Sequence, residues 1–387
     1  MLRSIRSSED VQHTLMRASV PNALPLSKTA ALYPSPWIGA LELCYSPRRG
    51  EAMAHRMRVV FCCAAALSLC CCSRSRTDAP SLVIYVYDSF ASEWGPGPEL
   101  ARRFYAKTGY SVQYVVFEDV TRAIHRAIRD QHTPSSRGAD LIIGVDQYTL
   151  PLAREADLFS PYQPALPLPH ALRIDPHNLA VPYDWGYVAF MFNTDAALPE
   201  PQRLSDLANP VYAKSIALAD PHTNVLGTIF IGWAHTSLGA AWPAFWNTLY
   251  RANLLALAPS WSAAYGLFTA GEAALVLSYT TSAAYHLHHD NHTRFKPLLF
   301  PEGHPMHIEG ISLVKRTKHA RVATQFIDFL LSTEAQELLP LTQWMYPANP
   351  DVPLPAAFSA VPQPAACVSL SPQMCRAAAA ALHASTP

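Results

Sequence analysis

The feature that most constrains the fold is an alternation of strand-like and helical segments that starts at residue 81. Ser81–Tyr87 is a β-branched and aromatic run, residues 98–107 repeat their apolar positions at helical spacing, and Ser111–Phe117 is strand-like again. A second helical segment, residues 120–130, leads to the apolar run at residues 140–146. Strands that alternate with helices predict an α/β fold in which helices cover a parallel sheet.

The alternation resumes after a Pro-rich stretch at residues 162–182, which we expect to be irregular. A second α/β unit follows and ends in a helical apolar stripe. The elements expected there lie at residues 181–192, 215–219, 242–257, 263–270, 274–278 and 322–331. Two such units predict two lobes around a cleft.

The expected lobes divide the chain into three parts. Residues 81–184 form mainly the first lobe, residues 185–285 mainly the second, and residues 286–387 are returning segments and a C-terminal tail. We expect mixed, mostly parallel sheets and a hinge, with Trp185-Gly186 and the stretch after Tyr285 as the candidate positions.

The first eighty residues form a different kind of sequence. Arg56 and Arg58 precede a short apolar run from Val59 that ends in cysteines. A positive flank followed by such a run is typical of an export signal, and the run is too short to span a membrane. The segment Leu67-Ser68-Leu69-Cys70 resembles the bacterial lipobox, which implies lipidation of Cys70. A signal that is cleaved without lipidation is the alternative.

A signal should not begin fifty residues inside a protein. We therefore interpret residues 1–52 as a non-native or disordered extension, with the true start at Met53 or Met57. Residues 53–80 would then be the signal or lipoprotein segment and its tether. This organisation predicts a periplasmic protein anchored to the membrane by lipid.

Charge is distributed unevenly along the chain. The whole sequence is neutral, with 29 Lys+Arg and 29 Asp+Glu, which argues against a nucleic-acid-binding protein. Residues 1–76 contain ten of the basic and four of the acidic residues, so the remainder has a formal charge of −6. This balance weakly favours a cationic ligand.

Aromatic residues and carboxylates gather where the expected strands end. Tyr87 precedes Asp88, Tyr183 precedes Asp184, and Asp119 follows another strand. Because ligands bind beyond the carboxyl ends of the strands in such sheets, these residues indicate a binding cleft. Aromatic faces combined with a few carboxylates suit a flat cationic ligand.

Two polar segments and a His-rich segment could also contribute to a site. Residues 278–282 are almost entirely hydroxyl-bearing, and residues 220–227 form a polar loop. His286, His288 and His289, followed by Asp290 and His292, could bind Zn²⁺ only if the backbone folded around the ion. We interpret this segment as a solvated helix end and expect neither a metal nor a cofactor.

Cysteine is absent between Ser73 and Ala366, so no thiol nucleophile is available in the expected cleft. The phosphate-binding loop and the common hydrolase motifs are also absent from the sequence. Cys367 and Cys375 are a candidate disulfide of the tail, since an oxidising compartment permits one. We expect a receptor and not an enzyme.

Several motifs, in order along residues 81–365, resemble those of the periplasmic thiamine-binding proteins of bacterial ABC importers. They are Tyr87-Asp-Ser-Phe with Trp94-Gly-Pro-Gly-Pro98, Ala139-Asp, Tyr183-Asp-x-Gly-Tyr187, Trp261-Ser-x-Ala-Tyr-Gly-Leu-Phe268, Leu275-Val-Leu-Ser-Tyr-Thr-Thr-Ser-x-Ala-Tyr-His286 and Trp344-Met-Tyr-Pro347. The resemblance implies a type II periplasmic-binding-protein fold. It also implies a monomer that binds thiamine, or its phosphate esters, between the lobes and delivers it to an inner-membrane ABC permease.

The resemblance also implies which residues bind the ligand. They are Tyr87, Asp119, Thr223, Asn224, Trp261, Tyr279, Thr280, Thr281, Ser282, Tyr285 and Trp344. The sequence departs from the family at Thr223-Asn224-Val225 and Asp119-Val120, which affects the expected polar contacts and the tolerance for phosphorylated thiamine.

Two other functions are compatible with the same fold. A thiaminase-like enzyme would need a cysteine in the cleft, and this chain has none there. A receptor for ferric ion or another metal would use Tyr279 and Tyr285, but these are not adjacent as in the ferric-ion family.

Overall fold

A computed structural model describes residues 81–290 and 293–385, with side chains described as far as residue 382. The described residues belong to one compact unit. The expected signal segment, the lipidation site Cys70 and the extension at residues 1–52 lie outside the described residues. Among the described helices, none combines the length and the apolar character that crossing a membrane requires.

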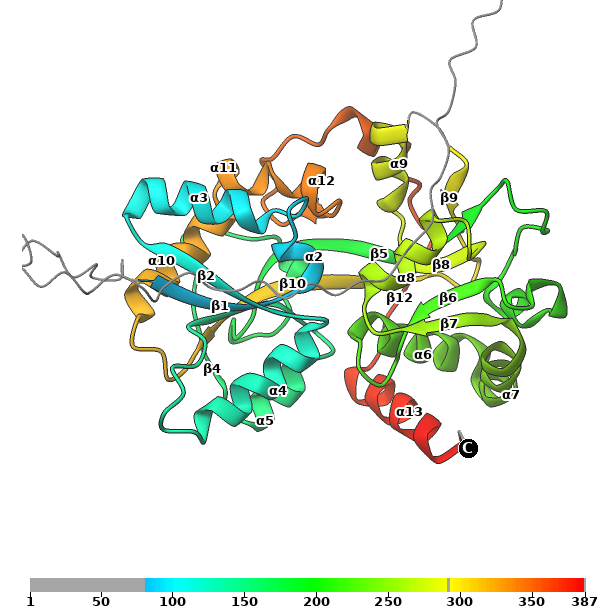
Figure 1. The fold of residues 1–387 in the computed structure, drawn as a ribbon, viewed down its shortest axis with the longest axis horizontal. Coiled ribbons are helices and arrows are strands. Elements are labelled where there is room, and N and C mark those ends of the chain that lie inside the picture. Colours follow the sequence, from blue (N-terminus) through cyan, green and yellow to red (C-terminus); the bar gives the residue numbers. More distant parts are fainter. Residues whose placement is uncertain (1–80, 291–292, 386–387) are drawn as a thin grey trace, which may run out of the picture. The chain divides into compact units, whose positions relative to one another are not determined.

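The described strands join in one mixed sheet with the order β2-β1-β3-β10-β5-β8-β6-β7 (Figure 1). These strands are β1 (Ser81–Tyr87), β2 (Ser111–Phe117), β3 (Leu141–Asp146), β5 (Val181–Asn193), β6 (Ile216–Ala219), β7 (Leu254–Ala258), β8 (Leu275–Tyr279) and β10 (His304–Val314). Four short strands pair beside them: β4 (Phe159–Ser160), β9 (Phe295–Pro297), β11 (Tyr346–Pro347) and β12 (Cys367–Val368).

The sheet has two parallel parts connected by two long antiparallel strands. β1 is parallel to β2 and β3, and β6 is parallel to β7 and β8. Strand β5 pairs with β10 as far as Tyr187 and with β8 from Val188 onward, so it leaves the first part beside Gly186. We call the part around β1–β3 the first half and the part around β6–β8 the second half. The predicted parallel pairing therefore holds within each half, whereas the connecting strands are antiparallel because the chain crosses and returns.

Helices cover both halves of the sheet. The first half carries α2 (Asp88–Ala91), α3 (Gly97–Thr108), α4 (Val120–Gln131), α5 (Leu150–Glu155), α10 (Ala320–Leu331), α11 (Thr333–Gln336) and α12 (Leu339–Thr342). The second half carries α6 (Val225–Leu238), α7 (Trp242–Thr248), α8 (Trp261–Thr269), α9 (Ser282–Asp290) and α13 (Pro372–Ser385). The chain thus crosses to the second half after β5 and returns along β10 to the first half, where α10, α11 and α12 follow. The last helix, α13, packs on α6 (Figure 1).

Most expected elements are confirmed within a few residues of their predicted ends, as β1, β2, α4 and α10 illustrate. Helix α6 is the main exception, since the sequence around residue 225 indicated only a polar loop. Its segment Val-Leu-Gly-Thr-Ile-Phe-Ile-Gly-Trp-Ala is apolar on nearly every side. A helix that is buried all round has no polar face, so helical periodicity cannot reveal it.

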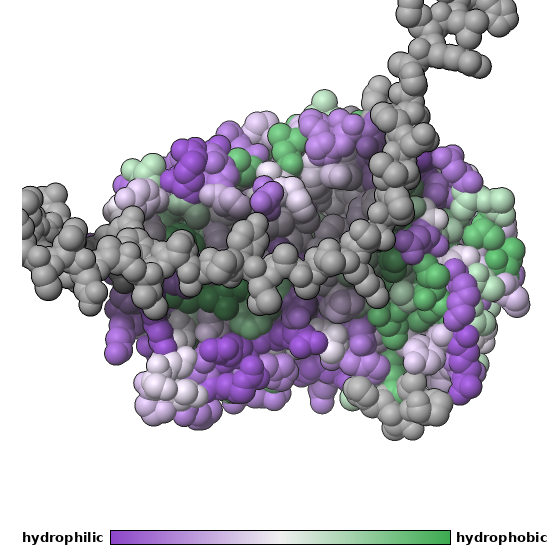
Figure 2. Space-filling view, viewed as in Figure 1, coloured by the Kyte–Doolittle hydropathy of each residue, from purple (hydrophilic) through white to green (hydrophobic). Residues whose placement is uncertain are grey.

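The surface differs between the halves on the face in Figure 2. Hydrophilic residues predominate over α3 and α4, whereas hydrophobic residues gather on the side of β6 and β7. Exposed large hydrophobic residues are scattered and include Val116 on β2 and Leu255 on β7.

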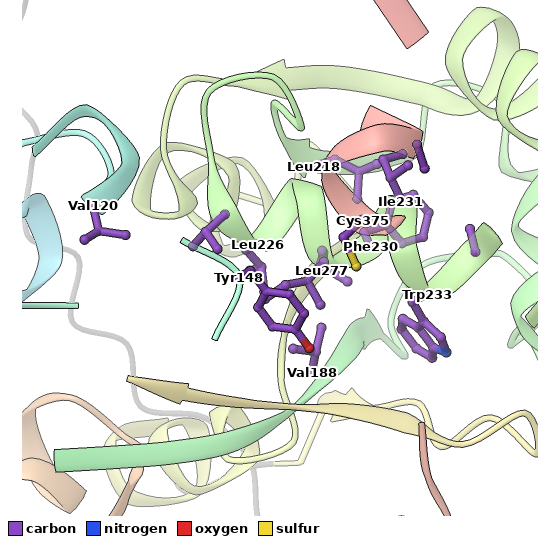
Figure 3. Packing of buried hydrophobic residues seen from close by; sticks show 14 of the residues in the cluster. Val120, Tyr148, Val188, Leu218, Leu226, Phe230, Ile231, Trp233, Leu277 and Cys375 are labelled. Carbon is purple, nitrogen blue, oxygen red and sulfur yellow. The ribbon is translucent and has the colours of Figure 1, made fainter. Parts of the chain in front are cut away.

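The candidate disulfide between Cys367 and Cys375 is wrong, because both cysteines are free. Cys375 lies in a buried cluster beside Phe230 and Ile231 of α6 (Figure 3), where a Cβ atom on Gly232 would come within 2.1 Å of its Sγ. Cys367 is exposed on β12. Packing of α13 on α6 thus places the Cys375 thiol in the interior.

Candidate ligand-binding site

A cavity of about 570 Å³ is lined by residues of both halves. Eight of the residues that the resemblance implies lie in its lining: Tyr87, Asp119, Asn224, Trp261, Tyr279, Ser282, Tyr285 and Trp344. The fold therefore brings together segments that are far apart in the sequence. Contact of these residues with a ligand stays a prediction.

Three other expected residues do not line the cavity. Thr280 and Thr281 are fully buried in the turn between β8 and α9, and the Thr281 hydroxyl lies 4.0 Å from Met345 Sδ. Thr223 lies just before α6, where the next residue, Asn224, caps the helix. The chain turns sharply between β8 and α9, so successive hydroxyls point in different directions. Only Tyr279 and Ser282 of the hydroxyl segment line the cavity.

Four aromatic residues form what we call the aromatic cluster: Trp261, Tyr265, Tyr285 and Trp344. Trp261 and Tyr265 are one turn apart on α8, and their rings stack with centroids 4.9 Å apart. Ser260 caps this helix by accepting a hydrogen bond from the Ala263 amide, which fixes where Trp261 begins the helix. The cluster presents flat apolar faces to the cavity.

Trp344 reaches this cluster through an unusual backbone conformation. Its φ of +57° lies in the left-handed region, which costs an L-residue roughly 1–2 kcal/mol. Its amide donates to the Leu339 carbonyl at 2.9 Å, and its ring meets Tyr285 edge-on at 5.3 Å. Strain of this kind persists where the surroundings hold it and is frequent at functional sites.

A second group, the carboxyl cluster, consists of Tyr87, Tyr183, Asp184 and Glu309. The hydroxyl of Tyr87 donates to Glu309 Oε2 at 2.9 Å and lies 2.9 Å from the Tyr183 hydroxyl, which itself is 3.4 Å from Oε2. Gln343 completes the network by donating to the Tyr87 hydroxyl at 2.6 Å. Tyr87 and Glu309 line the cavity.

Burial sets the protonation of this cluster. It raises the pKa of Asp184 well above the ordinary value, and the neighbouring charge of Glu309 adds to the rise. Burial also raises the pKa of Glu309, although the charge of His307 and the hydrogen bond from Tyr87 oppose that rise. Two buried carboxyl groups in contact thus favour a state with one proton between them.

Asp119 connects the two halves at the edge of the cavity. Its Oδ1 accepts from the Thr121 amide at 2.7 Å as the cap of α4, and its Oδ2 accepts from the Val225 amide of α6 at 3.1 Å. Burial raises its pKa to about 6, against the opposing hydrogen bonds from Thr121. Because backbone amides occupy both oxygens, Asp119 fixes the relative position of α4 and α6. A second connection runs from Asp88 Oδ1 to the Ser262 hydroxyl at 3.2 Å.

Sequence reasoning missed several polar residues of the lining, among them His307, Glu309 and Gln343. His307 Nε2 lies 2.7 Å from Asp146 Oδ2, and its Nδ1 lies 2.9 Å from the Tyr279 hydroxyl. Burial opposes protonation of His307, but the hydrogen bond and charge of Asp146 outweigh it and raise its pKa. One signal in the sequence could have revealed two of them. His307 and Glu309 are two positions apart in an apolar strand, so their side chains lie on the same face.

The His-rich segment lies on α9 as far as it is described, and His292 lies outside the described residues. His286 is buried, with Nε2 2.8 Å from the Tyr265 hydroxyl and Nδ1 2.8 Å from Asp290 Oδ2. Within residues 81–290 and 293–385, no group of three or more His, Cys, Asp or Glu side chains could hold a metal ion. His286 therefore supports the position of Tyr265 in the aromatic cluster.

Comparison with known proteins identifies relatives of similar length. The family described as bacterial extracellular solute-binding protein matches residues 136–365. The thiamine-binding periplasmic protein of Brucella abortus is 36% identical over 287 residues, which cover 73% of this chain and 84% of the relative. The protein of the same name from Escherichia coli is 32% identical over 293 residues, which cover 76% of this chain and 88% of the relative.

Solved structures agree on the fold. A periplasmic thiamin binding protein superimposes with a TM-score of 0.71 at 31% identity, covering 79% of this chain and 94% of that chain. A ferric binding protein from Campylobacter jejuni has a TM-score of 0.64 at 19% identity, and the superposition covers 78% of this chain and 97% of that chain. At that lower identity the likeness concerns the fold alone.

Proposed function

We propose a ligand for this chain, which belongs to the family of bacterial extracellular solute-binding proteins. The ligand is thiamine, held in the cavity that both halves line. The two-lobed type II periplasmic-binding-protein fold suits this role, because closure of two lobes excludes water from a ligand between them. The matching relatives are named as binding proteins and not as enzymes, in agreement with the prediction of a receptor.

The observation that supports thiamine is the charge of the lining. Among the described residues of the cavity, Asp88, Glu118, Asp119 and Glu309 carry carboxyl groups, and none is Lys or Arg. Thiamine combines a permanently cationic thiazolium with a flat aminopyrimidine. Each ring-to-cation contact contributes about 0.5–2 kcal/mol, and the aromatic cluster offers several. The names of the relatives point to the same ligand.

The same lining favours thiamine without phosphate. A phosphate ester carries negative charge and is usually bound by Arg or Lys, which the described lining lacks. The amides at the starts of α4 and α6 are already taken in part by Asp119 and Asn224. We therefore expect the affinity to fall from thiamine to its monophosphate and its diphosphate.

The remaining features of the proposal concern location and partners. The relatives are named as periplasmic proteins, which supports a periplasmic location. We propose that the chain acts as a monomer, is anchored by lipid at Cys70, and delivers thiamine to an inner-membrane ABC permease. Mass spectrometry of the native N-terminus tests the anchor, and a mature chain that starts elsewhere without lipid contradicts it.

Isothermal titration with thiamine, thiamine monophosphate and thiamine diphosphate tests the ligand. We expect heat on binding and quenching of tryptophan fluorescence, since Trp261 and Trp344 line the cavity. Absence of both signals with all three compounds would contradict the proposal. Fe³⁺ is titrated in parallel, and a visible absorbance band that requires Tyr279 would favour a metal receptor instead.

A further inference from the structure

Glu309 differs from the other carboxyl groups of the cavity in its burial and in the use of its oxygens. Amides occupy both oxygens of Asp119, and Glu118 is an exposed residue that pairs with Arg122 at 3.6 Å. Asp88 is only partly buried, and its Oδ1 accepts from the Ser89 amide and the Ser262 hydroxyl. Glu309 is only 7% exposed, and both tyrosine hydroxyls reach the same oxygen, Oε2. Its Oε1 accepts no hydrogen bond from an amide or hydroxyl of the described residues. A buried acceptor with unused capacity thus lines the cavity.

Asp184 supplies the other half of this arrangement. It lies directly opposite Glu309 where β5 pairs with β10, and it is fully buried. Neither of its oxygens has a hydrogen-bond donor among the described residues. Two charged carboxylates so placed would repel each other, whereas one proton between them satisfies both. The tyrosine hydroxyls donate to Glu309, so the negative charge is stabilised there and the proton belongs to Asp184.

We propose that Glu309 is the negatively charged contact for the cationic ring of the ligand, and that Asp184 is a positioning residue that holds a proton against it. This inference rests on the proposed function, because it assigns one end of a thiamine site. Asp146 and His307 also lie near Glu309, but they bind one another and Tyr279. Glu309 therefore has the unused acceptor among them.

The experiment compares two ligands of one shape and different charge. Thiamine is titrated against an analogue in which a neutral thiophene replaces the thiazolium ring. We expect the wild-type protein to bind thiamine at least about 10-fold more tightly than the analogue, because an ion at a buried carboxylate gains more than a neutral ring. We expect Glu309→Gln to lower the affinity for thiamine about 30-fold and to change the affinity for the analogue by less than about 3-fold.

Asp184 is tested by rescue. Asp184→Ala removes the group that donates to Glu309 and should lower the affinity for thiamine. Asp184→Asn retains an N–H donor and should bind thiamine nearly as tightly as the wild type does. The matched control is Asp140→Asn, which changes another buried carboxylate of the first half that bonds Val83 and Thr317 away from the cavity. It should lower stability and leave the ratio of the two affinities unchanged.

The outcomes separate the two proposals. If the wild type binds neither compound, the proposed function fails. If the wild type binds both compounds equally, or if folded Glu309→Gln keeps the wild-type ratio, thiamine binding stands and the role of Glu309 is overturned. If Glu309→Gln does not fold, the Asp184 variants decide the question, and an Asp184→Ala protein that keeps the wild-type ratio overturns the role of Glu309.

Discussion

The aromatic cluster and the carboxyl cluster reach the same cavity but are assembled in different ways. Trp261 and Tyr265 are neighbours on one turn of α8, so a short segment creates their stacked pair. Tyr87 and Glu309 are 222 residues apart and meet only because β1, β3, β10 and β5 lie side by side in the sheet. The stacked pair on α8 is therefore local in sequence, whereas the carboxyl cluster depends on strand pairing.

The largest expected effect tests the aromatic cluster. Trp261→Ala removes one face of the stacked pair and should weaken the binding of thiamine by about 10- to 100-fold and that of its neutral analogue by a smaller factor, because stacking acts on both ligands and the cation–π attraction on thiamine alone. Isothermal titration measures both affinities. Trp242, which lies outside the cavity, provides the control, since Trp242→Ala should change neither by more than about 2-fold. A loss of affinity confined to the cationic ligand would show that the aromatic cluster, and not the carboxyl cluster, recognises the charge.

The next effect concerns Asp119, which connects the halves. Its pKa of about 6 in the folded protein exceeds the ordinary value of 3.8, so between these pH values the folded state binds a proton that the unfolded state does not. The stability of the wild type relative to Asp119→Asn should therefore increase as the pH falls from 7 to 4, by about 2 kcal/mol. Chemical denaturation at a series of pH values measures this difference. A difference that does not depend on pH contradicts the raised pKa.

A smaller effect should appear where α13 packs on α6, the helix whose start meets Asp119. Gly232→Ala would place a methyl group 2.1 Å from Cys375 Sγ and should destabilise the protein by about 1–3 kcal/mol. The double variant Gly232→Ala with Cys375→Ala should recover part of the loss, because the sulfur is removed. Thermal unfolding compares the three proteins. An additive loss in the double variant would show that the two residues do not compete for space.

The smallest effect tests the strain at Trp344. Both Trp344→Gly and Trp344→Ala remove the ring and should lower the affinity for thiamine to a similar extent. Glycine accepts a positive φ without cost, so the Gly variant should be more stable than the Ala variant by about 1 kcal/mol. Equal stability of the two variants would mean that the backbone relaxes once the ring is gone.

Much of the local structure of this protein can be predicted from its sequence. The alternation from Ser81 predicts the strands and helices of the first half, because periodicity reflects which face of each element is buried. The ends of the expected strands indicated a cleft with aromatic residues and Asp119, and the family motifs specified which of these residues would bind the ligand. Periodicity failed at α6, where nearly every side of the helix is apolar.

Which polar groups meet depends on the way the strands pair in the folded chain. The register of β5 and β10 places Asp184 opposite Glu309, and the turn after β8 directs Thr280 and Thr281 away from the cavity. Both depend on contacts between residues that are distant along the chain, and hydrophobic patterns specify a face without specifying a partner. The charge that the cavity presents to its ligand is therefore a property of the folded sheet.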